Sequence, residues 1–89
     1  MAHKPFVSIT DSWVEVTGLI TAYDANKQYN VQNLAHCNVA FCVSASTPLT
    51  TMSYTEIHDF DVIVVPKDVI GLWAKCVGAT AGTLSIEEV

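Results

Sequence analysis

The strongest pattern in the chain is the two-residue alternation of apolar and polar positions towards its C-terminal end. Over residues 70–77, small or aliphatic side chains alternate with positions that include Trp73 and Lys75. A period of two is typical of a β-strand with one buried face. Residues 78–82 then offer glycine turn chemistry, and the alternation resumes to the end of the chain. We therefore expect a β-hairpin over residues 70–89, whose first strand buries Ile70, Leu72, Ala74 and Cys76.

Similar short runs recur along the rest of the chain. Turn-prone residues separate them, as at 24–27 and 46–48. In the second run, Val14 and Val16 would face the core, with Trp13 and Glu15 on the opposite face. The patterns predict strands over residues 6–10, 13–17, 29–34, 39–45 and 61–65.

The run over residues 39–45 carries no charge on either face, which is typical of a central strand. Its predicted inward residues are Val39, Phe41, Val43 and Ala45. Residues 49–60 give mixed signals and are expected to be irregular, with a helical turn or a loop at 56–59. We expect residues 1–5 to form an N-terminal arm and residues 6–89 to form a single β domain.

The composition favours pleated structure over helices. Twelve Val, six Ile and nine Thr stand against five Leu, and β-branched residues fit strands better than helices. Together with the spacing of the runs, this predicts an all-β fold of seven or eight short strands. A single small antiparallel β-sandwich or jelly-roll-like domain is expected, with a small barrel as the other option.

Hydropathy and charge restrict the partners of the chain. It is 51% apolar and 15% charged, and its mean hydropathy of +0.35 is high for a small monomer. Residues 28–55 lack charge, but polar side chains interrupt them throughout, so no membrane span is expected. Four Lys and no Arg give a net charge of −5, which argues against a nucleic-acid partner. Burial in a homo-oligomer, with a trimer or higher ring favoured, would cover the apolar surface.

The candidate chemical groups do not form a recognisable catalytic or metal-binding motif. Three cysteines are an odd number, and we expect reduced thiols. His36, Cys37 and Cys42 are close in sequence but lack the paired spacing of a zinc site. The acidic cluster around His58 lacks the glycine and spacing of a calcium loop. We therefore expect no metal, no cofactor and no enzymatic activity.

Aromatic residues are the better candidates for contacts. Trp13 and Trp73 both fall on the face opposite the predicted inward residues, while Tyr23 and Tyr54 lie in predicted loops. Trp and Tyr are enriched in interfaces, so these four are predicted interface or ligand contacts. The alternative is that a two-layer fold buries both faces of its central strands, and the indoles with them.

Two stretches of the chain resemble small β-structured virion proteins of tailed bacteriophages. The resemblance rests on YNVQN and VAFCVSAS followed by Pro48, and on IGLWAKC and GTLSIEEV, and covers about half of the chain. Proteins of this group include head-decoration, tail-knob and fibre-associated types. Residues 49–60 depart from the pattern because they lack a glycine turn.

The resemblance implies a non-enzymatic structural component of a virion, such as a capsid-decoration, tail-knob or adaptor protein. It would be synthesised in the host cytoplasm and would bind copies of itself and other virion proteins. The alternative is a β-sandwich module whose loops around Tyr23, Tyr54 and His58 bind a carbohydrate or a host receptor, with aromatic side chains stacked on sugar rings. A third class, an enzyme or metalloprotein built on His36 and His58, would require a bound metal.

Overall fold

The computed structural model describes residues 2–48 and 54–89, and these form eight strands and no helix. No helix in this part of the chain is long and apolar enough to cross a membrane. The all-β prediction is therefore confirmed. The strands are β1 (Ala2–Thr10), β2 (Val14–Glu15), β3 (Tyr29–Asn33), β4 (Asn38–Val43), β5 (Thr55–Ile57), β6 (Val62–Val65), β7 (Leu72–Val77) and β8 (Ala81–Glu88).

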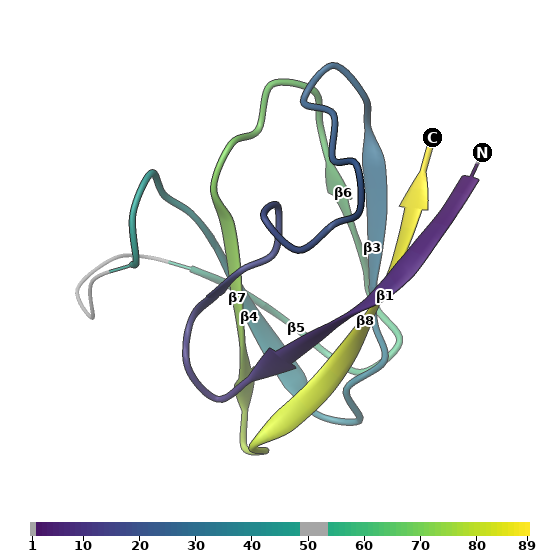
Figure 1. Cartoon of the computed structure of the whole chain (residues 1–89). Coiled ribbons are helices and arrows are strands. Elements are labelled where there is room, and N and C mark those ends of the chain that lie inside the picture. The colour runs from purple at the N-terminus through teal and green to yellow at the C-terminus, as the bar shows by residue number, and fades with distance from the viewer. Residues whose placement is uncertain (1, 49–53) are drawn as a thin grey trace.

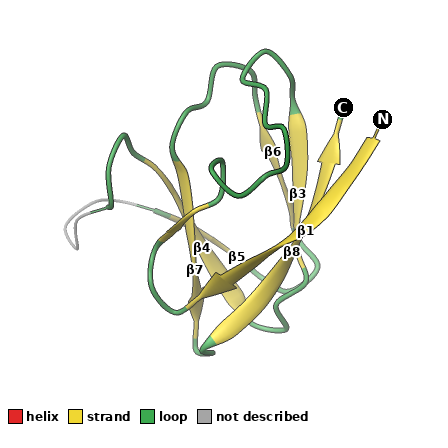
Figure 2. Ribbon diagram, viewed as in Figure 1, coloured by secondary structure: helices red, strands yellow, loops and turns green. Residues whose placement is uncertain are grey.

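The strands form two four-stranded antiparallel sheets that pack face to face (Figure 1, Figure 2). One sheet has the order β1-β8-β3-β6, and the other has the order β2-β7-β4-β5. The shortest dimension of the molecule is 17 Å, as expected for two sheets about 10 Å apart with side chains outside them. The architecture is a small β-sandwich, as the strand spacing predicted.

The core is the single apolar layer between the two sheets. From β8, Leu84 and Ile86 are fully buried, and Ser85 between them is partly exposed. From the opposite sheet, Ala74 of β7 and Val39 of β4 are equally buried. Burying a side chain of Val, Leu or Ile size contributes roughly 1.5–3 kcal/mol, so this layer is the main source of stability.

The predicted terminal hairpin is wrong. β7 pairs with β2 and β4, whereas β8 pairs with β1 and β3 in the other sheet. The segment after Val77 carries the chain across the sandwich, and the two strands diverge from it in Figure 1. Two strands that face each other across a core bury alternate residues, as two strands of a hairpin do. Periodicity alone therefore did not distinguish the two arrangements.

Several predicted inward positions also lie outside the core. Leu72, Ala74 and Cys76 are buried, but Ile70 is 77% exposed because it precedes β7 and belongs to the loop. In the same way, Val39 and Phe41 are buried, whereas Val43 and Ala45 are exposed where β4 ends. The alternation of apolar residues in the sequence extends beyond the start of β7 and the end of β4, so it overestimated the length of both strands.

The ends of the other elements differ from the prediction in three places. Residues 2–5, expected to form an arm, lie in β1, where residues 2–4 pair with β8 and a register shift follows between Lys4 and Val7. The run over residues 13–17 contributes only the two residues of β2. Within the segment expected to be irregular, Thr55–Ile57 forms β5 beside β4, and residues 49–53 lie outside the described residues.

Gly71 is required where the loop enters β7. Its φ is +81°, and a Cβ atom there would lie 2.1 Å from the main-chain oxygen of Ser44. Its carbonyl also accepts a 2.8 Å hydrogen bond from the Ser44 N–H. Gly78 has a similar φ of +86° but open space around its Cα. A side chain at Gly78 would therefore cost only the strain of positive φ, whereas a side chain at Gly71 would also collide with Ser44.

We expect Gly71→Ala to destabilise the protein more than Gly78→Ala does. The Gly78 variant loses only the freedom to adopt positive φ, which costs about 1–2 kcal/mol. The Gly71 variant must also push the β4 end away, for a total of about 3 kcal/mol or more. Urea unfolding measures both free energies. Equal losses in the two variants would contradict the close approach at Ser44.

Candidate functional site

Three of the four predicted contact residues lie on one surface, the outer face of the β2-β7-β4-β5 sheet. Trp13 directly precedes β2, Trp73 lies within β7, and Tyr54 directly precedes β5. In the register of the sheet, Trp73 lies opposite Glu15 on one side and Cys42 on the other. We name the surface formed by Trp13, Tyr54, Trp73 and Lys75 the aromatic face.

The ammonium group of Lys75 joins two of these rings. Its Nζ lies 4.8 Å from the centroid of the Trp13 ring and 5.8 Å from that of Tyr54. The two rings meet edge to face, with centroids 6.0 Å apart and planes at 70°. Cation–π contacts at exposed sites contribute about 0.5–1 kcal/mol each. They favour this arrangement of the two rings in the free protein.

Small residues on β4 explain why the large side chains gather here. Ala40 lies opposite Lys75, and Cys42 lies opposite Trp73. Both small residues are buried although they are on the outer face. The longer side chains opposite them on β7, Lys75 and Trp73, cover them. Small residues on one strand leave space that large cross-strand side chains can fill. The uncharged run that predicted a central strand therefore also forms the floor of the aromatic face.

The aromatic residues differ in how much of each remains free. Trp73 is half-buried, and its Nε1–H donates a 2.9 Å hydrogen bond to the Ser44 carbonyl. Trp13 is also half-buried, while Tyr54 is 50% exposed. Neither indole is fully buried, so both keep surface for a partner. Flat rings with polar tips and one cation suit stacking and apolar contact.

Tyr23 is the predicted contact residue that lies elsewhere. Its hydroxyl donates a 2.5 Å hydrogen bond to the Val69 carbonyl, and its ring stacks on Tyr29 at 5.0 Å. Burial raises the pKa of Tyr23, as do the nearby Tyr29 and Asp24. These contacts tie the loop between β2 and β3 to the loop before β7. Its internal hydrogen bond gives Tyr23 a structural role.

The polar candidates form pairs rather than a cluster. His36 Nδ1 lies 3.3 Å from Asp59 Oδ2, and His58 Nδ1 lies 3.6 Å from Asp61 Oδ2. Over residues 2–48 and 54–89, no three His, Cys, Asp or Glu side chains converge in a way that could hold a metal ion. Cys42 lies on the outer side of its sheet, away from the loop that holds His36.

Asn33 is a buried polar residue that the sequence interpretation did not single out. Its Nδ2–H₂ donates to the carbonyls of Cys37 at 2.8 Å and His58 at 3.0 Å, and its Oδ1 accepts from the Ala35 N–H at 2.8 Å. It holds together the two loops at one end of the sandwich. An amide at an inward position of the YNVQN alternation was the available signal.

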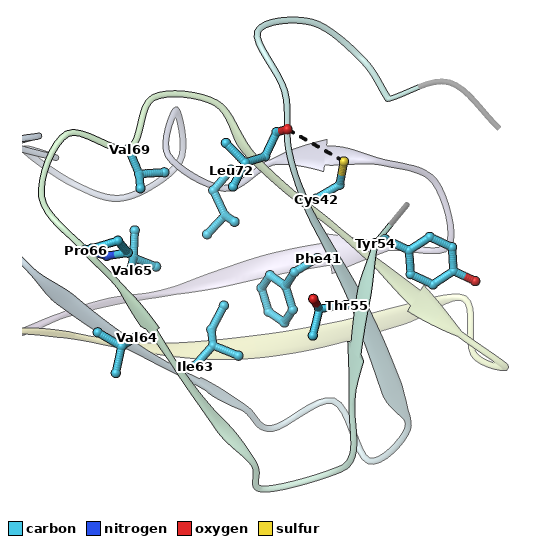
Figure 3. A pocket seen from close by; sticks show the side chains of 11 residues that line it. Phe41, Cys42, Tyr54, Thr55, Ile63, Val64, Val65, Pro66, Val69 and Leu72 are labelled. Atoms are coloured by element: carbon cyan, nitrogen blue, oxygen red, sulfur yellow. Dashed lines mark hydrogen bonds between the residues drawn. The ribbon is translucent and has the colours of Figure 1, made fainter. Parts of the chain in front are cut away.

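A second feature is an apolar groove of about 380 Å³ at the open side of the sandwich. It lies between β6 of one sheet and β4 and β5 of the other (Figure 3). Phe41, Ile63 and Leu72 line it, and Tyr54 borders it with its ring pointing away from these side chains. The groove is open because no strand covers the gap between β6 and β5 in the described residues.

Comparisons with protein-family models, with curated proteins and with solved structures gave no match to this chain. The resemblance to virion proteins therefore stays a prediction from the sequence.

We expect the Cys76 thiol to react slowly in the folded protein. Burial, and then the neighbouring Cys37 thiol, raise the pKa of Cys76 from 9.0 to about 11. At pH 8 the reactive thiolate is about a hundred-fold rarer than for an ordinary thiol. Timed iodoacetamide labelling with peptide mass spectrometry measures the rate, and unfolded protein is the control. Labelling of native Cys76 at the unfolded rate would contradict this environment.

The same shift predicts how stability changes in alkaline solution. The folded thiol keeps its proton up to a pH of about 11, whereas the unfolded thiol, with a pKa of 9.0, loses it earlier. The folded state then binds more protons, so the free energy of unfolding falls as the pH rises from 9 to 11. Urea titrations of wild type and Cys76→Ala at several pH values measure this. The variant should lack this component of the decline.

Proposed function

We propose that this chain is a non-enzymatic structural component of a tailed-phage virion, such as a capsid-decoration, tail-knob or adaptor protein. The virion setting rests on the resemblance of residues 29–43 and 70–89 to small virion proteins. The observation that supports an assembly role is the aromatic face, where Trp13, Tyr54 and Trp73 share one surface. In this role the chain binds copies of itself and other virion proteins.

The aromatic face has the composition of an interface. Large rings supply contact area while freezing few rotatable bonds, and Trp and Tyr carry much of the energy in measured interfaces. Acidic residues flank the rings on the same face, since Glu15 of β2 lies opposite Trp73 and Glu56 of β5 lies opposite Ala40. Polar side chains are common at the edges of interfaces. Lys75 also contacts the rings of Trp13 and Tyr54, and this ordering reduces the entropy lost on binding.

A second candidate function uses the same surface for a carbohydrate. Sugars present apolar C–H faces that stack on aromatic rings, and Tyr54 offers a half-exposed ring next to Trp13. Lys75 between them would donate hydrogen bonds to hydroxyls. The specific observation in favour of this function is the exposure of Tyr54 beside a fixed cation. The ligand would be a glycan or glycosylated receptor on a host surface.

Particle association tests the proposed function. Virions from the source, purified by density gradient and analysed by peptide mass spectrometry, should contain the chain in many copies per particle. Its complete absence from such particles would remove the virion function.

Variants at the aromatic face test which surface is used. We expect Tyr54→Ala to lower incorporation into particles by about ten-fold, because a central interface aromatic contributes more than 1 kcal/mol. Phe6→Ala is the matched control, since Phe6 is an exposed aromatic on β1 of the other sheet. Circular dichroism verifies that both variants are folded. Equal incorporation of both would exclude the aromatic face.

A glycan array distinguishes the carbohydrate alternative. Folded wild-type protein should give hits that Tyr54→Ala loses and Phe6→Ala keeps. An array without any hit for folded wild type removes this second function and leaves the assembly role untouched.

A further inference from the structure

The four sheet edges of the sandwich differ in how well they are protected. An unpaired edge can pair with another chain unless it is short, charged, interrupted by proline or bulged. β1 contains Pro5 and a register shift, and Lys4 forms an ion pair with Glu88 at 3.5 Å. β2 has two residues and β5 has three. β6, with the sequence VIVV, has no charge, proline or bulge.

The hydrogen-bond pattern shows which groups β6 presents on its free edge. The Asn33 N–H donates a 2.9 Å hydrogen bond to the Asp61 carbonyl. In an antiparallel pair such bonds recur at every second residue, so Ile63 and Val65 bond to β3. The N–H and C=O groups of Val62 and Val64 therefore point away from the sheet. In the part of the chain that the structure describes, no main-chain hydrogen bond reaches this edge.

The side chains along this edge are also unusually apolar. Val62 is 53% exposed and Val64 is 56% exposed on the outer face of their sheet. Phe60, just before the strand, is exposed as well. On the inner face of the same strand, Ile63 lines the open groove. An exposed apolar strand with free hydrogen-bonding groups is a ready template for one more strand.

We propose that the β6 edge pairs with β6 of a second copy of this chain. In an antiparallel pairing about a two-fold axis, Val62 lies opposite Val64 of the second copy, and Ile63 lies beside its own counterpart. Each Val62–Val64 pair exchanges two main-chain hydrogen bonds, so all four edge residues are satisfied. The two sheets of order β1-β8-β3-β6 become one continuous eight-stranded sheet.

Charge and shape favour a second copy over another occupant. The acidic Asp61 precedes β6, and the basic Lys67 follows it after Pro66. The antiparallel two-fold sets Lys67 diagonally across from Asp61 of the second copy at both ends, so opposite charges meet. The exposed valines of both copies form one apolar cluster on the outer face. A two-fold contact needs this self-complementarity, and β6 has it.

The edge contact does not rest on the proposed virion function. It uses the opposite sheet from the aromatic face, and purified chain alone is enough to form it. A chain absent from virions would therefore not contradict the edge contact, and a monomeric chain would not contradict the virion function.

Sedimentation velocity of the purified chain tests the proposal. At about 0.5 mM, where a contact with a Kd of about 10 μM is saturated, the mass should be twice the 9.6 kDa of the chain. Val64→Pro removes only an N–H that faces the free edge, a place where folded sheets accept proline. The Val64→Pro substitution should raise the Kd of the dimer about a hundred-fold, since two intermolecular hydrogen bonds are lost and the proline ring keeps the two β6 strands apart.

Ser8→Pro is the matched control. Ser8 lies on β1, the other edge of the same sheet. Leu34 N–H bonds to the Thr83 carbonyl at 3.0 Å, so by alternation Ser8, opposite Thr83, faces away from β8. This variant should dimerise like the wild type. A Val64→Pro chain that fails to fold, judged by circular dichroism, moves the test to the cysteine variant below.

A cysteine cross-link tests the register. Ile63→Cys places a thiol beside its counterpart at the two-fold axis, in a non-hydrogen-bonded pair whose Cα atoms are about 4.5 Å apart. Mild oxidation should give a disulfide-linked dimer on a non-reducing gel. Wild type, which keeps Cys37, Cys42 and Cys76, should give none.

Two results overturn the proposal. One is a wild-type chain that stays monomeric at about 0.5 mM, well above a Kd of about 10 μM. The β6 edge would then be available to a strand of another protein and not to a second copy. The other is a dimer that Ser8→Pro disrupts and Val64→Pro does not. A dimer lost with Val64→Pro, or cross-linked through Ile63→Cys alone, supports it.

Discussion

The structure depends on burying one apolar layer between two sheets. A chain of 89 residues removes a limited share of its surface from water, so both sheets must contribute a complete inner face. The C-terminal segment makes this possible because it supplies a central strand to each sheet: β7 lies between β2 and β4, and β8 lies between β1 and β3. The crossing after Val77 therefore connects the two halves of the core.

The same constraint decides which surfaces remain for partners. The inner faces are used in the core, so contacts must come from outer faces and free edges. On one sheet the small residues Ala40 and Cys42 let larger neighbours form the aromatic face. On the other sheet β6 is left as an uncharged edge. Two different contact surfaces on opposite sheets would let a small subunit extend an assembly in two directions.

The sequence predicted the class of fold well because strand periodicity is a local property. β3 and β4 were placed to within a residue or two by YNVQN and the uncharged run after Asn38. The pairing of β7 with β8 failed because alternation does not specify the partner strand. Ile70 and Val43 were misplaced because strand ends depend on tertiary contacts, such as the approach of Gly71 to Ser44.

The candidate site was partly predictable for the same reason. The alternation of side chains along a strand placed Trp13 and Trp73 on an outer face, and both lie there with Tyr54. That these residues share one sheet, while Tyr23 bonds internally to Val69, depends on strand order, which no local pattern encodes. The free edge of β6 depends on strand order as well, because a four-residue apolar run reads the same in a central strand and an edge strand.

Cross-strand nuclear Overhauser effects test the crossing of the last two strands most directly. The sandwich predicts main-chain contacts between Ala74 and Phe41 and between Leu84 and Val7, which are register partners. It predicts none between the main chains of Ala74 and Leu84. A terminal hairpin with its turn after Val77 would set Ala74 opposite Leu84, so strong main-chain contacts between those two residues would contradict the structure.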